Sequence, residues 1–141
     1  MHVRAAVLGL ILILALPGAA AAKSKTLTGK IGQISDARIS LKVAYDKKGK
    51  PTKVSKVKIT RLSYRCPQID ARGELNFGIP GTFTPAGRTL RFRKTATIQG
   101  RVVRFKGNFE FSPKVVQGEV DVKFTQSGAR CVNGSIGFTA R

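Results

Sequence analysis

Apolar and polar residues alternate with a period of two along most of the chain beyond residue 22. This pattern is typical of β-strands that bury one face and expose the other. In residues 38–45 the apolar phase consists of Ile39, Leu41, Val43 and Tyr45. Later segments have these apolar phases: Leu90 and Phe92; Val103, Phe105, Phe109 and Phe111; Val120, Val122 and Phe124; Ile136 and Phe138. We therefore predict a strand in each segment.

Turns and one change of phase interrupt the alternation. Residues 46–49 end in Gly49 and suit a hairpin turn, because glycine adopts positive φ without strain. In the returning segment the apolar phase shifts after Ile59. We predict a β-bulge near Thr60 and Arg61, which would keep the apolar residues on both sides of it facing inward.

The whole pattern predicts one fold class. About eight short strands joined by short turns indicate an all-β domain, either an antiparallel sandwich or a flattened meander barrel. Residues 66–84 are less regular and define their strands poorly. Gly107 falls in the inward phase between Phe105 and Phe109, where the missing side chain lets the sheet bend or a neighbouring ring fill the gap.

The first 22 residues have the organisation of a cleavable export signal. A positive start precedes an apolar stretch over residues 5–16, which ends before a run of alanines. We expect cleavage after Ala21 or Ala22, so that residues 1–22 are a signal peptide and residues 23–141 a single secreted or extracytoplasmic domain. The alternative is an N-terminal membrane anchor, because the apolar segment approaches the minimum length that spans a bilayer.

The only two cysteines are Cys66 and Cys131. An even pair in an exported chain predicts a disulfide, and two buried free thiols are the alternative. Because the bond would close a long loop, the chain-entropy treatment assigns it about 4 kcal/mol.

The cysteines also support a resemblance. An export leader, a mid-chain cysteine and a late Cys-x-x-Gly, here residues 131–134, resemble the layout of a diffuse group of short exported bacterial β-proteins. Since no activity is defined for that group, the resemblance implies compartment and fold class but no function.

The sequence excludes several kinds of chemistry. Because the one histidine is His2, the mature domain has no histidine for acid–base catalysis, a Cys–His nucleophile or a zinc site. Glu119 and Asp121 share a strand face, as a catalytic pair or a cation site would require, but we interpret them as counter-charges among basic residues. Asn133 begins an N-glycosylation sequon. We therefore predict no enzyme, no cofactor and no metal site.

Charge is the unusual feature of this chain. Its 26 lysines and arginines outnumber 7 acidic residues, for a formal charge of +19, which attracts polyanions. In the strand pattern these basic residues point outward: Lys42, Lys56, Lys58, Arg61, Arg65, Arg91, Arg93, Arg104 and Lys106. They predict a cationic surface, although lysines on strand faces also serve solubility and block edge pairing. Nucleic acid is disfavoured, because the aromatic residues fall in the core phase.

Three functions are compatible with these patterns. The first is a non-enzymatic exported module that binds anionic polymers of the cell envelope through its basic sheet face. The second is a β-barrel carrier of a small apolar ligand, which a core filled by Phe105, Phe109, Phe124 and Phe138 would disfavour. The third and least favoured is an enzyme of unfamiliar type, which would need a concave site around Glu119, Asp121 or a lysine.

Overall fold

The computed structural model describes residues 23–32 and 36–141, so the predicted signal peptide lies outside the described residues. Over these residues the chain forms eight antiparallel strands, which confirms the all-β prediction. The strands are β1 (Lys23–Ile31), β2 (Arg38–Tyr45), β3 (Pro51–Cys66), β4 (Ala71–Ile79), β5 (Thr89–Ile98), β6 (Arg101–Phe111), β7 (Val116–Gln126) and β8 (Ala129–Ala140), and a short 3₁₀ helix, η1 (Pro67–Ile69), follows β3. No helix in the described part of the chain is long and apolar enough to cross a membrane.

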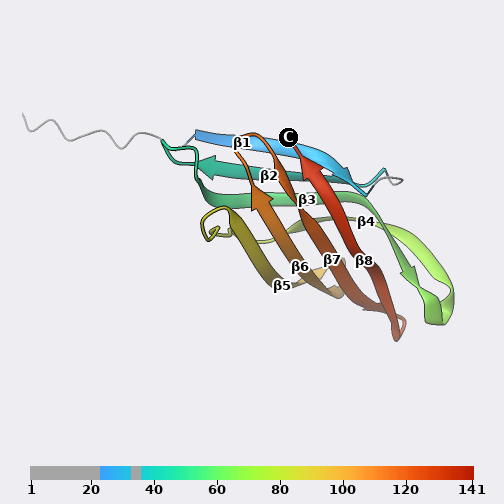
Figure 1. Ribbon diagram of the computed structural model, residues 1–141. Helices are drawn as coiled ribbons and strands as arrows, with labels where there is room; N and C mark the ends of the chain where they lie inside the picture. The colour runs from blue at the N-terminus through green and yellow to red at the C-terminus, as the bar shows by residue number, and fades with distance from the viewer. Residues whose placement is uncertain (1–22, 33–35) are drawn as a thin grey trace, which may run out of the picture.

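All eight strands belong to one sheet in the order β4-β3-β2-β1-β8-β7-β6-β5. Each strand pairs with its neighbour in sequence except at β4 and β5, which are the two edges, and β1 pairs with β8 through Gly29–Ile31. Figure 1 shows that the sheet folds over into two crossing layers. We call them the β1–β4 layer and the β5–β8 layer.

The inner faces of the two layers share a single core. Aromatic pairs join them: the Phe77 and Phe105 rings lie 4.9 Å apart, as do the Tyr64 and Phe124 rings. The alternation therefore identified the buried faces correctly. The four phenylalanines named above for the carrier alternative, Phe105, Phe109, Phe124 and Phe138, are all buried in this core. A core so filled with aromatic rings disfavours the carrier.

The predicted bulge near Thr60 and Arg61 is confirmed. The pairing of β3 with β4 shifts between Ile59 and Leu62, Arg61 has a φ of 55°, and its backbone N–H donates to Asn76 Oδ1. A second bulge, which the sequence did not predict, lies at Lys56, where φ is 51°. Together the bulges keep the apolar residues of β3 on the inner face, because each one restores the phase.

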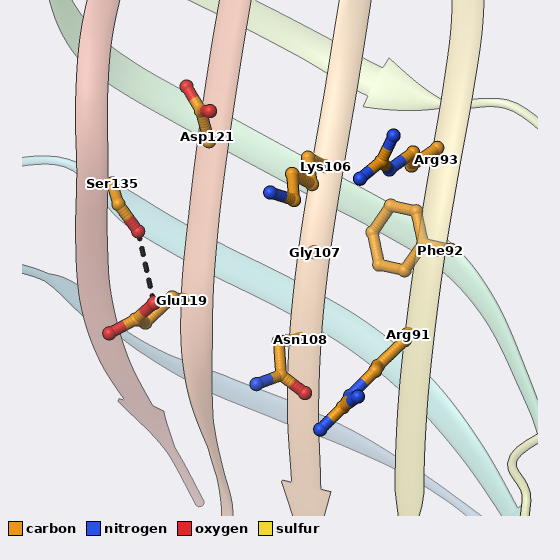
Figure 2. A pocket seen from close by; sticks show the side chains of 9 residues that line it. All are labelled: Arg91, Phe92, Arg93, Lys106, Gly107, Asn108, Glu119, Asp121 and Ser135. Carbon is orange, nitrogen blue, oxygen red and sulfur yellow. Dashed lines mark hydrogen bonds between the residues drawn. The ribbon is translucent and has the colours of Figure 1, made fainter.

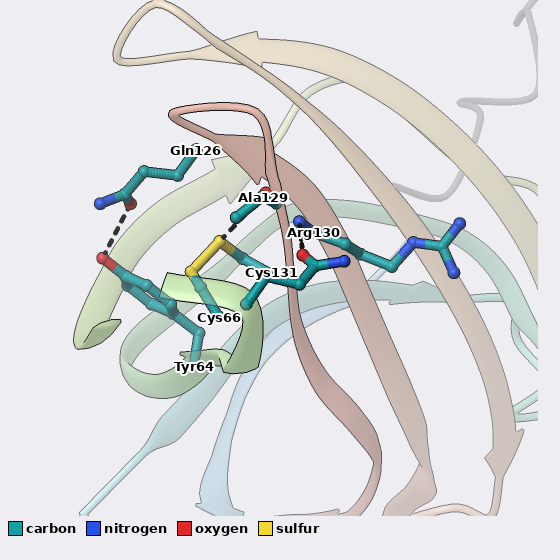
Figure 3. Close-up of a disulfide and its surroundings, with 7 residues drawn as sticks. Tyr64, Cys66, Gln126, Ala129, Arg130 and Cys131 are labelled. Carbon is teal, nitrogen blue, oxygen red and sulfur yellow. Dashed lines mark hydrogen bonds between the residues drawn. A yellow bond between two sulfur atoms is a disulfide. The ribbon is translucent and has the colours of Figure 1, made fainter. Parts of the chain in front are cut away.

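The predicted disulfide between Cys66 and Cys131 is also confirmed (Figure 3). It connects the end of β3 to β8, which are not neighbours in the main strand order. Beside it, the Tyr64 hydroxyl donates to Gln126 Oε1 at 3.2 Å, and the Arg130 N–H donates to Gln68 Oε1 at 2.6 Å. These contacts fasten the β1–β4 layer to the hairpin between β7 and β8.

Gly107 lies where the ring of a neighbour fills the space of its missing side chain. It pairs with Phe92 across β5 and β6, and a Cβ at Gly107 would come within 2.3 Å of the Phe92 ring. This bears out the second of the two roles expected for Gly107. The close approach lets β5 carry a large ring into the core without pushing β6 away.

Candidate functional site

The nine predicted anion-binding residues fall into two groups. Five lie on the β1–β4 layer: Lys42, Lys56, Lys58, Arg61 and Arg65. Four lie on the β5–β8 layer: Arg91, Arg93, Arg104 and Lys106. Because both inner faces contribute to one core, the outward residues of the two layers face opposite sides of the molecule. The nine residues therefore do not form one continuous surface.

The group on the β1–β4 layer is dispersed. Arg61 forms ion pairs with Asp36 at 3.2 Å and with Glu74 at 3.6 Å, so its charge is already compensated. Lys42 pairs with Ser55, and Lys58 lies between Ser40 and Gly78 on the outer face. Lys56, at its bulge, and Lys58 line a separate hollow of about 420 Å³, whereas Arg65 stands at the far end of β3. Only these two lysines of the five are brought together, and no arginine of the group lies with them.

The group on the β5–β8 layer is gathered by register. Arg93 pairs directly with Lys106. Arg104 lies diagonally across from Arg93, and Arg91 lies diagonally across from Lys106. Arg91 pairs with Asn108 and Arg104 with Thr95. These four basic residues form no ion pair or side-chain hydrogen bond with any described residue. Their charges are therefore available to a ligand.

This outer face is hollowed. A depression of about 550 Å³ is lined by Arg91, Phe92, Arg93, Lys106, Gly107, Asn108, Glu119, Asp121 and Ser135 (Figure 2). A second hollow of about 900 Å³ shares Arg91, Asn108 and Glu119 with it, and a third of about 360 Å³ shares Arg93, Lys106 and Asp121. Because the three hollows share walls, they form one depression across β5–β8 that reaches Lys30 of β1, and we call it the groove.

The groove exists because small and large outward residues alternate across the strands. Gly137 pairs with Glu119, and Ser135 pairs with Asp121, so β8 contributes almost no bulk beside the acids. Asn108 is short as well, whereas the flanking basic side chains are long. Figure 2 shows Arg91 and Arg93 reaching from β5 toward β6, with Lys106 rising between them and the acids.

The two acids of the main hollow are held at one side of it by neighbouring groups. Glu119 Oε2 accepts a hydrogen bond from Ser135 Oγ at 3.0 Å. Asp121 Oδ2 lies 3.3 Å from Lys123 Nζ, and its other oxygen, Oδ1, is buried without a hydrogen-bond partner among the described residues. The side chain of Asp121 is 18% exposed. The main hollow is therefore bipolar, with a basic side on β5 and β6 and an acidic side on β7. The adjoining hollows add Glu110 of β6 and Lys123 of β7.

The outward phase of the strands predicted the basic side of this site, but it did not connect that side to Glu119 and Asp121 and gave no binding role to Asn108, Ser135 or Lys123. The sequence predicts which residues of each strand face outward, but it does not predict which strands lie beside one another. The hollow does gather Glu119, Asp121 and Lys106, the groups that the enzyme alternative would require. Within the described ranges, no three His, Cys, Asp or Glu residues are grouped to hold a metal ion.

The N-glycosylation sequon is not accessible in the folded domain. Asn133 lies at the irregularity between β7 and β8, and its Oδ1 accepts a hydrogen bond from the Val122 N–H at 2.7 Å. Its Nδ2, the atom to which a glycan would be attached, is buried. Asn133 therefore acts as a backbone partner for β7 in this structure.

Comparison of the chain with protein-family models, curated proteins and solved structures finds no match.

Proposed function

We propose that the protein is a non-enzymatic exported module that binds anionic polymers of the cell envelope in the groove. One observation carries the proposal. Arg91, Arg93 and Lys106 face outward on adjacent strands, line one hollow and form no ion pair with a described residue, although Lys106 lies directly across from Asp121. Arg104 extends the same basic side into the adjoining hollow.

The physics of this arrangement suits a polymer better than a single small anion. Adjacent antiparallel strands lie about 4.8 Å apart, so charges on β5 and β6 add at short range. A polyanion laid along them releases condensed counterions, which makes binding favourable at low salt and weak at high salt. Arginine also donates in pairs to carboxylates and phosphates, which lysine does not.

The compartment is supported by the disulfide. A bond between Cys66 and Cys131 persists in an oxidising environment, as found outside the cytoplasm. Fractionation of the native cells tests this part. We expect the protein in the envelope fraction and its release by salt; recovery from the cytoplasm would contradict export.

The binding test compares two triple variants with equal loss of charge. R91A/R93A/K106A removes the basic side of the main hollow, and K42A/K53A/K58A removes three outward lysines from the opposite layer. Affinity for polyphosphate and for polygalacturonate is measured over a salt series. We expect the groove variant to bind on the order of tenfold more weakly or worse, with the salt slope reduced by about one per contact removed.

The control variant should stay close to the wild type, because its charges act only at long range and are screened by salt. Equal losses in both variants would show that net charge, not the groove, drives binding. The length of each polymer is also measured after prolonged incubation. It should be unchanged, and shortened polymer would contradict the non-enzymatic part of the proposal.

A further inference from the structure

The acids in the groove are in the wrong place for a ligand that carries only negative charge. Glu119 and Asp121 line the same hollow as Arg91, Arg93 and Lys106. The two acids project from β7, two strands away from β5, which is about 10 Å across the sheet. A bare polyanion wide enough to fill the hollow would meet both carboxylates and be repelled by them.

The acidic side also offers an acceptor that no neighbour occupies. Glu119 Oε2 accepts from the Ser135 hydroxyl, whereas no described residue donates to Glu119 Oε1. The oxygens of Asp121 are less available, because Oδ2 faces Lys123 and Oδ1 is buried. An exposed carboxylate oxygen such as Glu119 Oε1 accepts a hydrogen bond from a ligand hydroxyl. The Asn108 side chain lies between the two sides of the hollow and offers both a donor and an acceptor.

We propose that the ligand is an acidic polysaccharide, a sugar chain that carries an anionic substituent together with free hydroxyl groups. This inference rests on the proposed function and specifies its ligand. The anionic substituent binds Arg91, Arg93 and Lys106, while a sugar hydroxyl donates to Glu119, and the charge of Asp121 adds to the acidic side. Such a ligand satisfies both sides of the groove at once, whereas a polyphosphate satisfies only one.

The shape of the groove suits a polysaccharide chain that extends beyond the main hollow at both ends. The main hollow of about 550 Å³ lies within the range of ligand sites and holds a short saccharide. Hollows that share walls with it continue the groove on both sides. The lining offers no exposed aromatic face on which a base could stack, because the Phe92 ring is buried against Gly107.

The test uses two polymers of similar charge per unit. Polygalacturonate has one carboxylate and free hydroxyls on each sugar, whereas polyphosphate has charge but no hydroxyls. At equal concentrations of charged units, we expect the wild type to bind polygalacturonate at least about tenfold more tightly, since charge-assisted hydrogen bonds add to the ionic attraction. The variant E119Q/D121N should bind polyphosphate more tightly and polygalacturonate more weakly than the wild type does.

The variant D46N/D70N is the matched control, because it removes two acids without an ion pair, Asp46 in the turn after β2 and Asp70 after η1, and should strengthen binding of both polymers slightly and equally. If the wild type binds both polymers equally and E119Q/D121N tightens both, the inference about sugars is overturned while the proposed function stands. If the wild type binds neither polymer, the proposed function fails as well. The preference of the wild type is decisive by itself, even should E119Q/D121N fold poorly.

Discussion

The two layers of this protein begin from the same alternation of residues but have different outer faces. On the β1–β4 layer, Arg61 is compensated by Asp36 and Glu74, and a separate hollow brings together only Lys56 and Lys58. On the β5–β8 layer, register places Arg93 beside Lys106, and a groove opens next to them. The strands of the β1–β4 layer carry the larger number of basic residues, so the count of charges alone does not explain where the groove lies.

The difference shows that short outward residues matter as much as charged ones. A row of long side chains makes a flat, well-solvated face, whereas glycine and serine beside long side chains leave a hollow. In the β5–β8 layer, Ser135 and Gly137 leave that space next to Asp121 and Glu119. A binding site on a sheet of this kind needs both a source of charge and a place where bulk is missing.

The largest expected effect comes from the bond that ties the two layers together. The double variant C66A/C131A should lose about 4 kcal/mol in its free energy of unfolding, because the long loop is no longer constrained in the unfolded chain. Urea unfolding of the variant, and of the wild type with reductant, measures this loss. A change below about 1 kcal/mol would mean that β3 and β8 hold together without the bond.

A smaller loss of stability is expected from substituting a glycine in the β5–β8 layer, and a glycine in the β1–β4 layer serves for comparison. Gly107→Ala should cost about 2 kcal/mol, because its Cβ would overlap the Phe92 ring at 2.3 Å. Gly78→Ala, on β4, is the matched control: its Cβ would meet only Val57 O, at 3.7 Å, so stability should stay within about 0.5 kcal/mol. Thermal unfolding compares the two variants.

The companion variant F92L/G107A checks the cause of that loss. A smaller side chain at position 92 makes room for the new methyl group, so part of the stability should return relative to G107A alone. Equal costs for Gly107→Ala and Gly78→Ala would remove the argument that β5 and β6 depend on the close approach of Phe92.

Within the β1–β4 layer, Tyr45 should produce a dependence on pH. Its hydroxyl is buried with no hydrogen-bond partner in the described ranges, and burial raises the pKa of Tyr45 above its ordinary value of 10.0. Between the ordinary and the raised pKa, Tyr45 ionises in the unfolded chain but not in the folded chain. The free energy of unfolding therefore falls as the pH rises above about 10. Tyr45→Phe should lack this fall and gain about 1 kcal/mol at neutral pH.

Chemical denaturation of the wild type and Tyr45→Phe at neutral pH and above pH 10 measures this difference. The comparison between variants cancels the titration of the many lysines, which both proteins share. Parallel loss of stability in the two proteins would exclude Tyr45 as the cause.

The smallest effect sharpens the contrast in charge between the layers. Arg61→Ala should leave the salt slope of polygalacturonate binding unchanged, because Asp36 and Glu74 already compensate Arg61. Arg93→Ala should lower that slope by about one, because Arg93 has no such partner. Equal slopes for the two variants would argue that the compensated and uncompensated arginines contribute alike.

Much of this fold could be predicted because its signals are local. Alternation identified the inward faces of the strands, the phase change after Ile59 located one bulge, and the even cysteine count indicated the disulfide. The bulge at Lys56 escaped, because it inserts its extra residue within a polar run and leaves little trace in the apolar pattern. The strand β4 was poorly defined for a different reason: its inward phase has apolar side chains only from Leu75 onward, because Gly73 takes an inward position without a side chain.

The groove could not be predicted from such local signals. Arg93, Lys106 and Asp121 lie on three different strands. The residues near each of them in the sequence do not indicate which residues it faces on the neighbouring strand. The alternation of side chains is a property of a single strand. The sequence of each strand therefore predicts which of its residues are buried and that its exposed face is basic. Pairing of β1 with β8 and the register among β5–β8 depend on packing across the whole domain. Only that packing brings acids and arginines into one hollow and separates them from the lysines of the other layer.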